Sequence, residues 1–272
     1  MVRAEDLNSK PIVTIPYEYL ETGGARRYGE LPVLMGMARG LPDTLDALVL
    51  TSDLQGIEPS GLACGQPRLL GTVVATWLHA MASSKVIPAP ERTGVVLAGD
   101  FHVDTSLGKR GGSGDVRPVW EAFGSCMKWV AGVPGNHDRF EASESGGVEF
   151  SSGSKCDFLD GRTVDVDSVR IAGLGGVIGA SKRPYRRPET DFLKALKQLC
   201  SAGPDVLVLH QSPDGRRDGC EGSVPIRDCL ESLMPMFVVV GHTVWPEPIV
   251  NLKNGTQVLN VAGRVVVLRR RD

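Results

Sequence analysis

The chain has 272 residues, of which 42% are hydrophobic and 23% are charged, and its formal net charge is −2. This near-neutral balance provides no overall charge that would attract nucleic acid or an anionic membrane. The first ten residues lack the apolar core of a signal peptide, and no uncharged apolar stretch is long enough to span a bilayer, so we expect a cytoplasmic protein with no membrane partner.

Residues 1–45 come first and do not share the pattern of the rest of the chain. Several prolines and glycines interrupt them, and no apolar repeat is evident. We predict that they form an N-terminal extension packed on the core. The even spacing of apolar runs after them predicts that residues 46–272 form one large domain.

Short apolar runs rich in β-branched residues follow in this domain and predict buried strands. Between them, apolar residues recur at helical spacing, which predicts helices over residues 69–81 and 192–200. Alternating strands and helices are typical of an α/β fold. The predicted strands cover residues 46–51, 94–98, 128–133, 169–174, 205–209, 236–240, 257–261 and 264–268.

Two further features of the chain have structural rather than catalytic interpretations. The glycine-rich residues 173–179 lack the spacing of a dinucleotide-binding loop, so they predict a tight turn. The six cysteines include no CxxC pair, and a chain of this size does not need a disulfide framework, so we expect free thiols.

Polar residues of the types that bind metals follow five of the predicted strands. A rigid sheet would aim side chains at such positions toward one point. Carboxylate, amide and imidazole groups together suit Mn²⁺, Fe or Zn²⁺ better than Ca²⁺, which prefers oxygen ligands alone. The candidates in chain order are Asp53, Gln55, Asp100, Asn136, His137, His210 and His242.

Such a ligand set indicates hydrolysis of a phosphoester. One carboxylate between two cations would hold them ~3.5–4 Å apart, where they clamp a phosphoryl group and convert a bridging water into hydroxide. No protein nucleophile is then required. We therefore expect two divalent transition metals, with Mn²⁺ favoured and Fe or Zn²⁺ as alternatives.

The ordered motifs resemble those of the calcineurin-like metallophosphoesterase superfamily. The resemblance spans roughly residues 46–268 and implies a four-layer α-β-β-α sandwich with two mixed sheets, in which residues 46–272 would be the catalytic domain. The motifs that carry it are Asp53-Leu54-Gln55, Gly99-Asp100, Gly135-Asn136-His137-Asp138, His210 and Gly241-His242-Thr243.

The resemblance also implies a role for each candidate. Asp53 would bind the first metal and Asp100 would bridge both metals. His137 would approach the scissile phosphate, where its imidazole stabilises charge or protonates the leaving oxygen, and Asp138 would orient the ring of His137. The second metal would be bound by Asn136, His210 and His242.

Two departures from the family pattern weaken the first metal site. Gln55 stands where the family usually has a histidine, and Val244 stands where it usually has another. An amide oxygen binds these metals more weakly than imidazole does, and valine does not bind them. His102 is either a substitute metal ligand or a substrate contact.

Basic residues gather in loops that would follow the strands. Solvent-exposed charge is the usual explanation for any single residue of this kind. Three clusters in a net acidic chain favour a substrate with more than one phosphate, which leads to the hypothesis of a nucleotide or nucleic-acid phosphodiester. The clusters are Lys109 and Arg110, then Lys182, Arg183, Arg186 and Arg187, then Arg216 and Arg217, with Arg183, Arg186 and Arg187 as the predicted phosphate-binding residues.

Two alternatives to the phosphodiesterase remain open. The motifs describe the phosphate clamp and not the rest of the substrate, so a phosphomonoesterase acting on a small molecule or phosphoprotein fits them equally well. A non-catalytic metal-binding scaffold would explain the missing histidines. The presence of His137 beside Asn136 favours an enzyme, because a scaffold has no need of a charge-stabilising imidazole.

Overall fold

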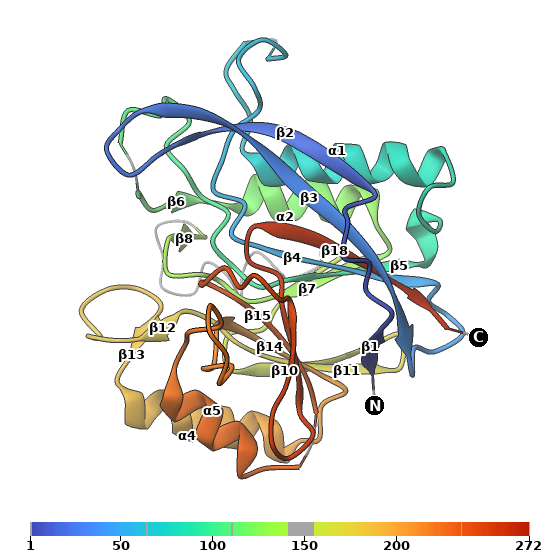
Figure 1. The fold of residues 1–272 in the computed structure, drawn as a ribbon, viewed down its shortest axis with the longest axis vertical. Helices are drawn as coiled ribbons and strands as arrows, with labels where there is room; N and C mark the ends of the chain where they lie inside the picture. The colour runs from blue at the N-terminus through green and yellow to red at the C-terminus, as the bar shows by residue number, and fades with distance from the viewer. Residues whose placement is uncertain (1, 64, 110, 141–154, 235, 272) are drawn as a thin grey trace.

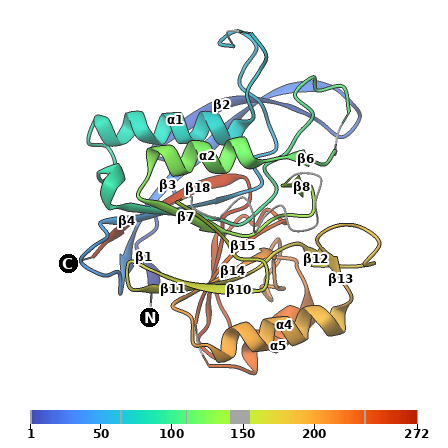
Figure 2. The ribbon, with the colours of Figure 1, turned by 180° about the vertical axis from the view of Figure 1, so that it is seen from behind.

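The computed structural model describes residues 2–63, 65–109, 111–140, 155–234 and 236–271. Two large sheets lie face to face, with one pair of helices outside each sheet (Figures 1 and 2). Both sheets contain parallel and antiparallel pairs. The prediction of an α/β fold with mixed sheets is confirmed.

The first large sheet contains strands from both ends of the chain. Its order is β1-β3-β18-β4-β5-β7-β9, with β2 paired to β3 at one side. β4, β5, β7 and β9 run parallel, whereas β18 pairs antiparallel with β4 and parallel with β3. The strands are β1 (Arg3–Glu5), β2 (Val13–Leu20), β3 (Arg26–Arg39), β4 (Ala47–Ser52), β5 (Thr93–Leu97), β7 (Trp129–Gly132), β9 (Cys156–Phe158) and β18 (Arg264–Arg270).

The second large sheet has a parallel centre. Its order is β10-β11-β14-β15-β17-β16, in which β11, β14, β15 and β17 run parallel. Two short pairs lie outside the sheets: β6 (Gly114–Asp115) with β8 (Asp138–Arg139), and β12 (Val177–Ile178) with β13 (Arg186–Arg187). The strands of the sheet are β10 (Arg162–Val166), β11 (Val169–Leu174), β14 (Val206–Gln211), β15 (Phe237–Gly241), β16 (Ile249–Asn251) and β17 (Gln257–Asn260).

Three apolar layers hold the sheets and helices together. The first lies between the first sheet and helices α1 (Leu70–Ser83) and α2 (Arg117–Cys126), and the third lies between the second sheet and α4 (Glu189–Ser201) and α5 (Val224–Glu231). The middle layer fills the space between the sheets. Because side chains alternate along a strand, fully buried strands such as β4 supply Val49 to the first layer and Leu48 and Leu50 to the middle one.

The structure contains a strand at each predicted strand position and a helix at each of the two predicted helix positions. α2, α5 and the three N-terminal strands were not predicted. Residues 3–39 supply β1, β2 and β3, and β3 pairs directly with β18, so these residues extend the first sheet. Among the described residues, no helix is long and apolar enough to cross a membrane.

The predicted tight turn at residues 173–179 and the predicted free thiols both agree with the structure. At the predicted tight turn, a Cβ added at Gly176 would lie 1.9 Å from the backbone oxygen of Tyr185, so only glycine fits there. Five cysteines are free thiols, and Cys64 lies outside the described residues.

Candidate metal centre

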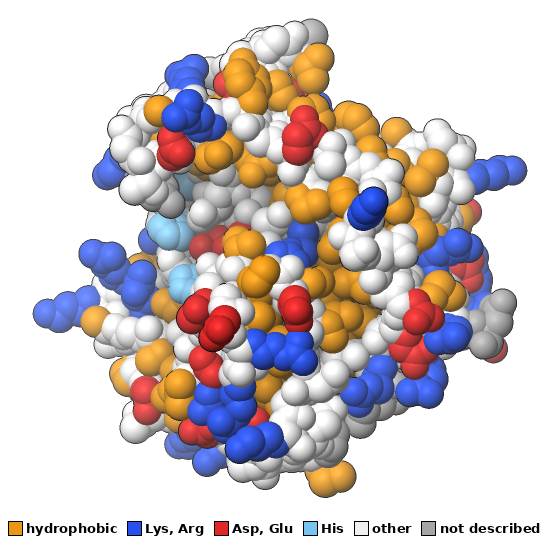
Figure 3. Space-filling model, viewed as in Figure 1, with side chains coloured by type: hydrophobic (Ala, Val, Ile, Leu, Met, Phe, Trp, Pro, Cys, Tyr) orange, Lys and Arg blue, Asp and Glu red, His pale blue; other side chains and the backbone are white. Residues whose placement is uncertain are grey.

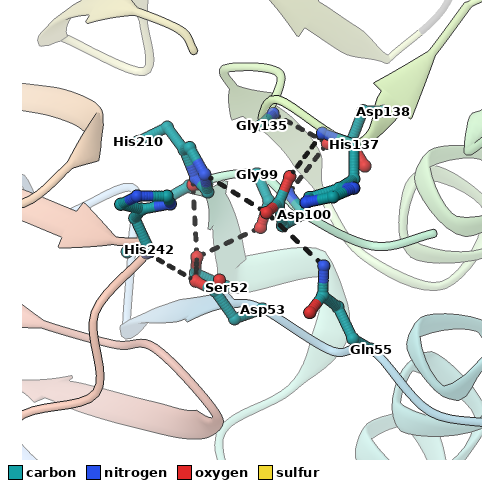
Figure 4. Close-up of polar contacts among 12 residues, drawn as sticks. Ser52, Asp53, Gln55, Gly99, Asp100, Gly135, His137, Asp138, His210 and His242 are labelled. Carbon is teal, nitrogen blue, oxygen red and sulfur yellow. Dashed lines mark hydrogen bonds and ion pairs between the residues drawn. The ribbon is translucent and has the colours of Figure 1, made fainter. Parts of the chain in front are cut away.

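The candidate site forms where strands of both sheets end. Asp53 follows β4, Asp100 follows β5, and His137 follows β7 in the first sheet. The second sheet contributes the last part of β14, with His210, and the residue after β15, His242. Figure 4 shows these side chains converging from the two sheets, with Asp100 between the two histidines of the second sheet and His137.

Three of the predicted ligands form a compact group. One ligand atom from each of Asp100, His210 and His242 lies within 4.8 Å of the others. Nε2 of His210 is 3.4 Å from Oδ2 of Asp100, and the rings of His210 and His242 meet edge to face with centroids 5.1 Å apart. A carboxylate and two imidazoles at this spacing are suitable ligands for one divalent transition metal.

Two buried atoms beside this group have no hydrogen-bond partner. Nδ1 of His210 lies 2.7 Å from the carbonyl oxygen of Ala98, which can only accept, so Nδ1 carries a proton and Nε2 is left to hold either a second proton or a metal. This Nε2 and Oδ1 of Asn136 are buried and make no hydrogen bond. A buried polar atom without a hydrogen-bond partner is costly, whereas a metal would satisfy both atoms.

The charges of the site favour a cation at its centre. Burial lowers the pKa of His210, but the negative charge and close contact of Asp100, with Asp53 behind it, raise that pKa to about 9, so a proton sits at Nε2 where a metal would replace it. Burial and the charge of His210 lower the pKa of His242 to about 4, which leaves its imidazole neutral and able to bind a metal. Burial raises the pKa of Asp53, and the nearby charge of Asp100 raises it further.

The Asp53 side of the site is built differently. Oδ2 of Asp53 accepts hydrogen bonds from the backbone N–H of His242 at 2.8 Å and from the hydroxyl of Ser52. Gln55 is exposed, and its amide nitrogen lies 3.5 Å from Oδ2 of Asp100. Hydrogen bonds within the protein therefore already occupy Oδ2 of Asp53. The amide nitrogen of Gln55, rather than its oxygen, faces Asp100.

Three candidate ligands adopt a backbone conformation that is unusual for residues other than glycine. The φ angles are +55° at Asp53, +59° at Asp100 and +70° at His242. Left-handed backbone at such residues is uncommon, costs about 1–3 kcal/mol each and clusters at functional sites. The backbone is thus strained just after these strands, at the residues whose side chains turn toward the candidate metal centre.

Close packing of glycines lets the strand ends approach one another. A Cβ on Gly135 would lie 2.0 Å from Oδ1 of Asp100, and one on Gly241 would lie 2.0 Å from the hydroxyl of Ser52. Both distances are far below van der Waals contact, so a side chain at either position would force the site apart.

His137 is held by its backbone and by one ring nitrogen. Its N–H donates to Oδ1 of Asp100 at 2.9 Å, and its Nδ1 lies 2.7 Å from the carbonyl oxygen of Gly112. The carbonyl requires the proton on Nδ1, which leaves Nε2 as the nitrogen available to a substrate.

Asp138 does not orient this ring, so that prediction was wrong. Its fully buried carboxylate instead accepts the backbone N–H groups of Asp100, Phe101 and Gly135, each at 2.8 Å. Burial, with the charge of Asp100, raises its pKa. Asp138 therefore ties the turn after β7 to the turn after β5, and the carbonyl of Gly112 has the ring-orienting role.

His102 lies outside the compact ligand group found among the described residues. Its ring packs on the loop that also holds His137, since a Cβ on Gly114 would lie 2.3 Å from Cε1 of His102. Burial lowers its pKa. Its Nδ1 is buried without a hydrogen-bond partner in the described part of the chain, and both predicted roles of His102, a metal ligand or a substrate contact, stay predictions.

The predicted phosphate-binding arginines have separate environments. Arg187 pairs with Asp160 at 2.7 Å and donates to the carbonyl of Gly175 at 3.1 Å, so its guanidinium has a structural role that competes with the predicted binding of phosphate. Arg183 is exposed, and Arg186 is half-buried. Among the other basic clusters, Arg216 pairs with Glu231 and Arg217 with Glu247, while Arg110 lies outside the described residues.

A supporting network behind His242 was not predicted. The Asn260 side chain donates to the hydroxyl of Ser212 at 3.1 Å and to the carbonyl of Thr243 at 2.7 Å, and Ser212 in turn donates to the carbonyl of Gly241. Asn260 lies near the end of the predicted strand over residues 257–261, and a polar residue at that position was the signal available in the sequence.

The site opens to the surface through a hollow. Figure 3 shows histidine and acidic side chains between the upper and lower parts of the molecule, with Lys and Arg side chains standing beside them over the β12–β13 segment. A substrate therefore has access to the strand ends from this face.

Comparison with known proteins supports the fold alone. No protein-family model and no curated protein matches the chain. The protein TT1561 of Thermus thermophilus is similar over 79% of this chain and 88% of its own, with a TM-score of 0.53 and 15% identity. A hypothetical protein from the same organism shares 14% identity over 79% of this chain and 75% of its own, with a TM-score of 0.45.

Proposed function

We propose that this protein is a metal-dependent phosphoester hydrolase of the calcineurin-like metallophosphoesterase type, with a phosphodiester as the favoured substrate. The observation that carries the proposal is the compact group of Asp100, His210 and His242, together with two buried atoms that have no hydrogen-bond partner, Nε2 of His210 and Oδ1 of Asn136. The layered α/β arrangement and the motif order are consistent with that superfamily.

The residues present fit one divalent transition metal well and a second one less well. Asp100, Asn136, His210 and His242 would hold the better-bound ion, and Asp53 with Gln55 would share Asp100 for the other. Ions of this kind supply positive charge for the phosphoryl oxygens and lower the pKa of water. Mn²⁺ is the favoured ion, with Fe or Zn²⁺ as alternatives, because the donors mix nitrogen and oxygen.

His137 would act on the leaving group. The hydrogen bond from its Nδ1 to Gly112 fixes the ring, so that a proton held at Nε2 can pass to the leaving oxygen or stabilise negative charge on it. A scaffold without catalysis would not need this arrangement. The fixed ring therefore favours the enzyme over the scaffold.

The test is hydrolysis of an aryl phosphodiester and its matching monoester in the presence of Mn²⁺, Zn²⁺, Mg²⁺ or a chelator. We expect turnover with Mn²⁺, none with chelator, and a faster reaction of the diester. His137→Ala should lower kcat by about 10²–10⁴-fold, the usual contribution of a general acid, while metal content stays unchanged.

Asn136→Ala should reduce both activity and bound metal. His79→Ala serves as a control, because His79 is an exposed residue of α1 and is not part of the compact ligand group. Bound metal without turnover on either ester would contradict the enzyme and support the scaffold. Faster turnover of the monoester would replace the diester in the proposal.

A further inference from the structure

The β12–β13 pair is anchored beside the candidate ligands. The backbone N–H of Ile178 in β12 donates to the side-chain oxygen of Gln211 at 2.7 Å, and Gln211 directly follows His210. The pair continues through the N–H of Gly179, which donates to the carbonyl of Arg187 at 2.8 Å. Side chains on these two strands therefore have a defined position relative to His210.

Adjacent arginines on β13 have opposite environments. The guanidinium of Arg187 is neutralised by Asp160. Arg186, one residue earlier, points to the other face of the strand, as alternation requires, and has no carboxylate partner among the described residues. Its side chain lies across Gly179, where an added Cβ would be 3.3 Å from a guanidinium nitrogen.

The β12–β13 segment lies beside the candidate centre. Figure 3 shows Lys and Arg side chains over this segment, next to the histidine side chains of the hollow. A half-buried guanidinium without a carboxylate partner, on an anchored strand, is suited to bind an anion. The planar donors of a guanidinium match the oxygens of a phosphate group.

We infer that Arg186 binds a second phosphate of the substrate, next to the phosphate held by the strand-end ligands. This inference rests on the proposed function and specifies its substrate class as phosphoesters with a further phosphate group. Arg186 is then a residue of substrate specificity, and Arg187 positions it by fixing β13 against Asp160.

Anion binding tests the inference without turnover. Calorimetry on the Mn²⁺-loaded protein would compare inorganic pyrophosphate, which carries two adjacent phosphates, with inorganic phosphate. We expect Arg186→Gln to weaken pyrophosphate binding about 10-fold, the loss of one charge-assisted interaction, and to change phosphate binding less than about twofold. Arg186→Lys should recover part of the affinity.

Lys194→Gln is the matched control, because it removes one positive charge from an exposed position of α4. It should leave both affinities unchanged, and circular dichroism and Tm should show that every variant is folded. Equal weakening of both anions by Arg186→Gln would overturn the inference, since Arg186 would then contact the first phosphate. Unchanged pyrophosphate binding would also overturn it, although the esterase assay could still succeed.

Discussion

The candidate ligands on the two sides of Asp100 differ in the hydrogen bonds that they already make within the protein. On the His210 side, Nε2 of His210 and Oδ1 of Asn136 are buried without partners, and the His210 ring is fixed by Ala98. On the Asp53 side, the carboxylate already accepts two protein hydrogen bonds and Gln55 is exposed. The proposed metal would therefore meet buried atoms without hydrogen-bond partners on the His210 side, whereas on the Asp53 side it would compete with protein donors.

The largest effect should come from removing a ligand on the His210 side. His210→Ala should lower Mn²⁺-dependent kcat/KM by on the order of 10²–10³-fold or more, because it removes a fixed contribution to charge stabilisation at the centre. Gln55→Ala should lower it less than about 10-fold. Steady-state kinetics at saturating Mn²⁺ would measure both, and equal losses would show that the two sides do not differ.

An intermediate effect is expected at Asp53. Asp53→Asn keeps the shape of the side chain but removes its charge, so it should abolish binding of the ion on the Asp53 side and retain the ion on the His210 side. Activity should fall about 10- to 100-fold, the range associated with disturbed metal positioning. Metal analysis after dialysis should find one ion per chain; loss of both ions would contradict the separate roles of the two sides.

Metal binding should also stabilise the fold. At a free Mn²⁺ concentration of 100 times Kd, the stabilisation is about 2.7 kcal/mol, which corresponds to a rise in Tm of several degrees for a chain of this size. Calorimetric scans should show this rise in the wild type and in Gln55→Ala. The rise should be absent in His210→Ala, and its persistence there would place the main ion elsewhere.

The smallest effect is a gain. Gln55→His together with Val244→His places imidazoles at the two positions where the resembling family has them. Val244 is 62% exposed, so the larger side chain should fit without disturbing the core. We expect the ion on the Asp53 side to bind about 10-fold tighter, since imidazole is a better ligand than an amide. Titration with Mn²⁺ would measure this gain. An unchanged affinity would mean that the hydrogen bonds to Asp53, and not the missing imidazoles, limit metal binding on the Asp53 side.

The sequence predicted the parts of the molecule that depend on local pattern. Buried parallel strands are continuous apolar runs, so their ends, and with them Asp100 and His210, could be located without the structure. The partners of Asp138 and the pairing of Arg187 with Asp160 could not be predicted, because they join residues distant in the chain. β2 and β3 were missed because prolines and half-buried polar residues obscure their alternation.

The N-terminal strands have a consequence for the behaviour of shortened chains. β3 covers one side of β18, whose sequence Arg-Val-Val-Val-Leu-Arg-Arg is apolar and β-branched at its centre. Leu20 at the end of β2 also packs with Val103 and Leu107, in the segment that follows Asp100. A protein begun at residue 46 would expose β18 as an unprotected edge, which invites strand-to-strand aggregation. An insoluble truncation product would then say nothing about whether residues 1–45 take part in catalysis.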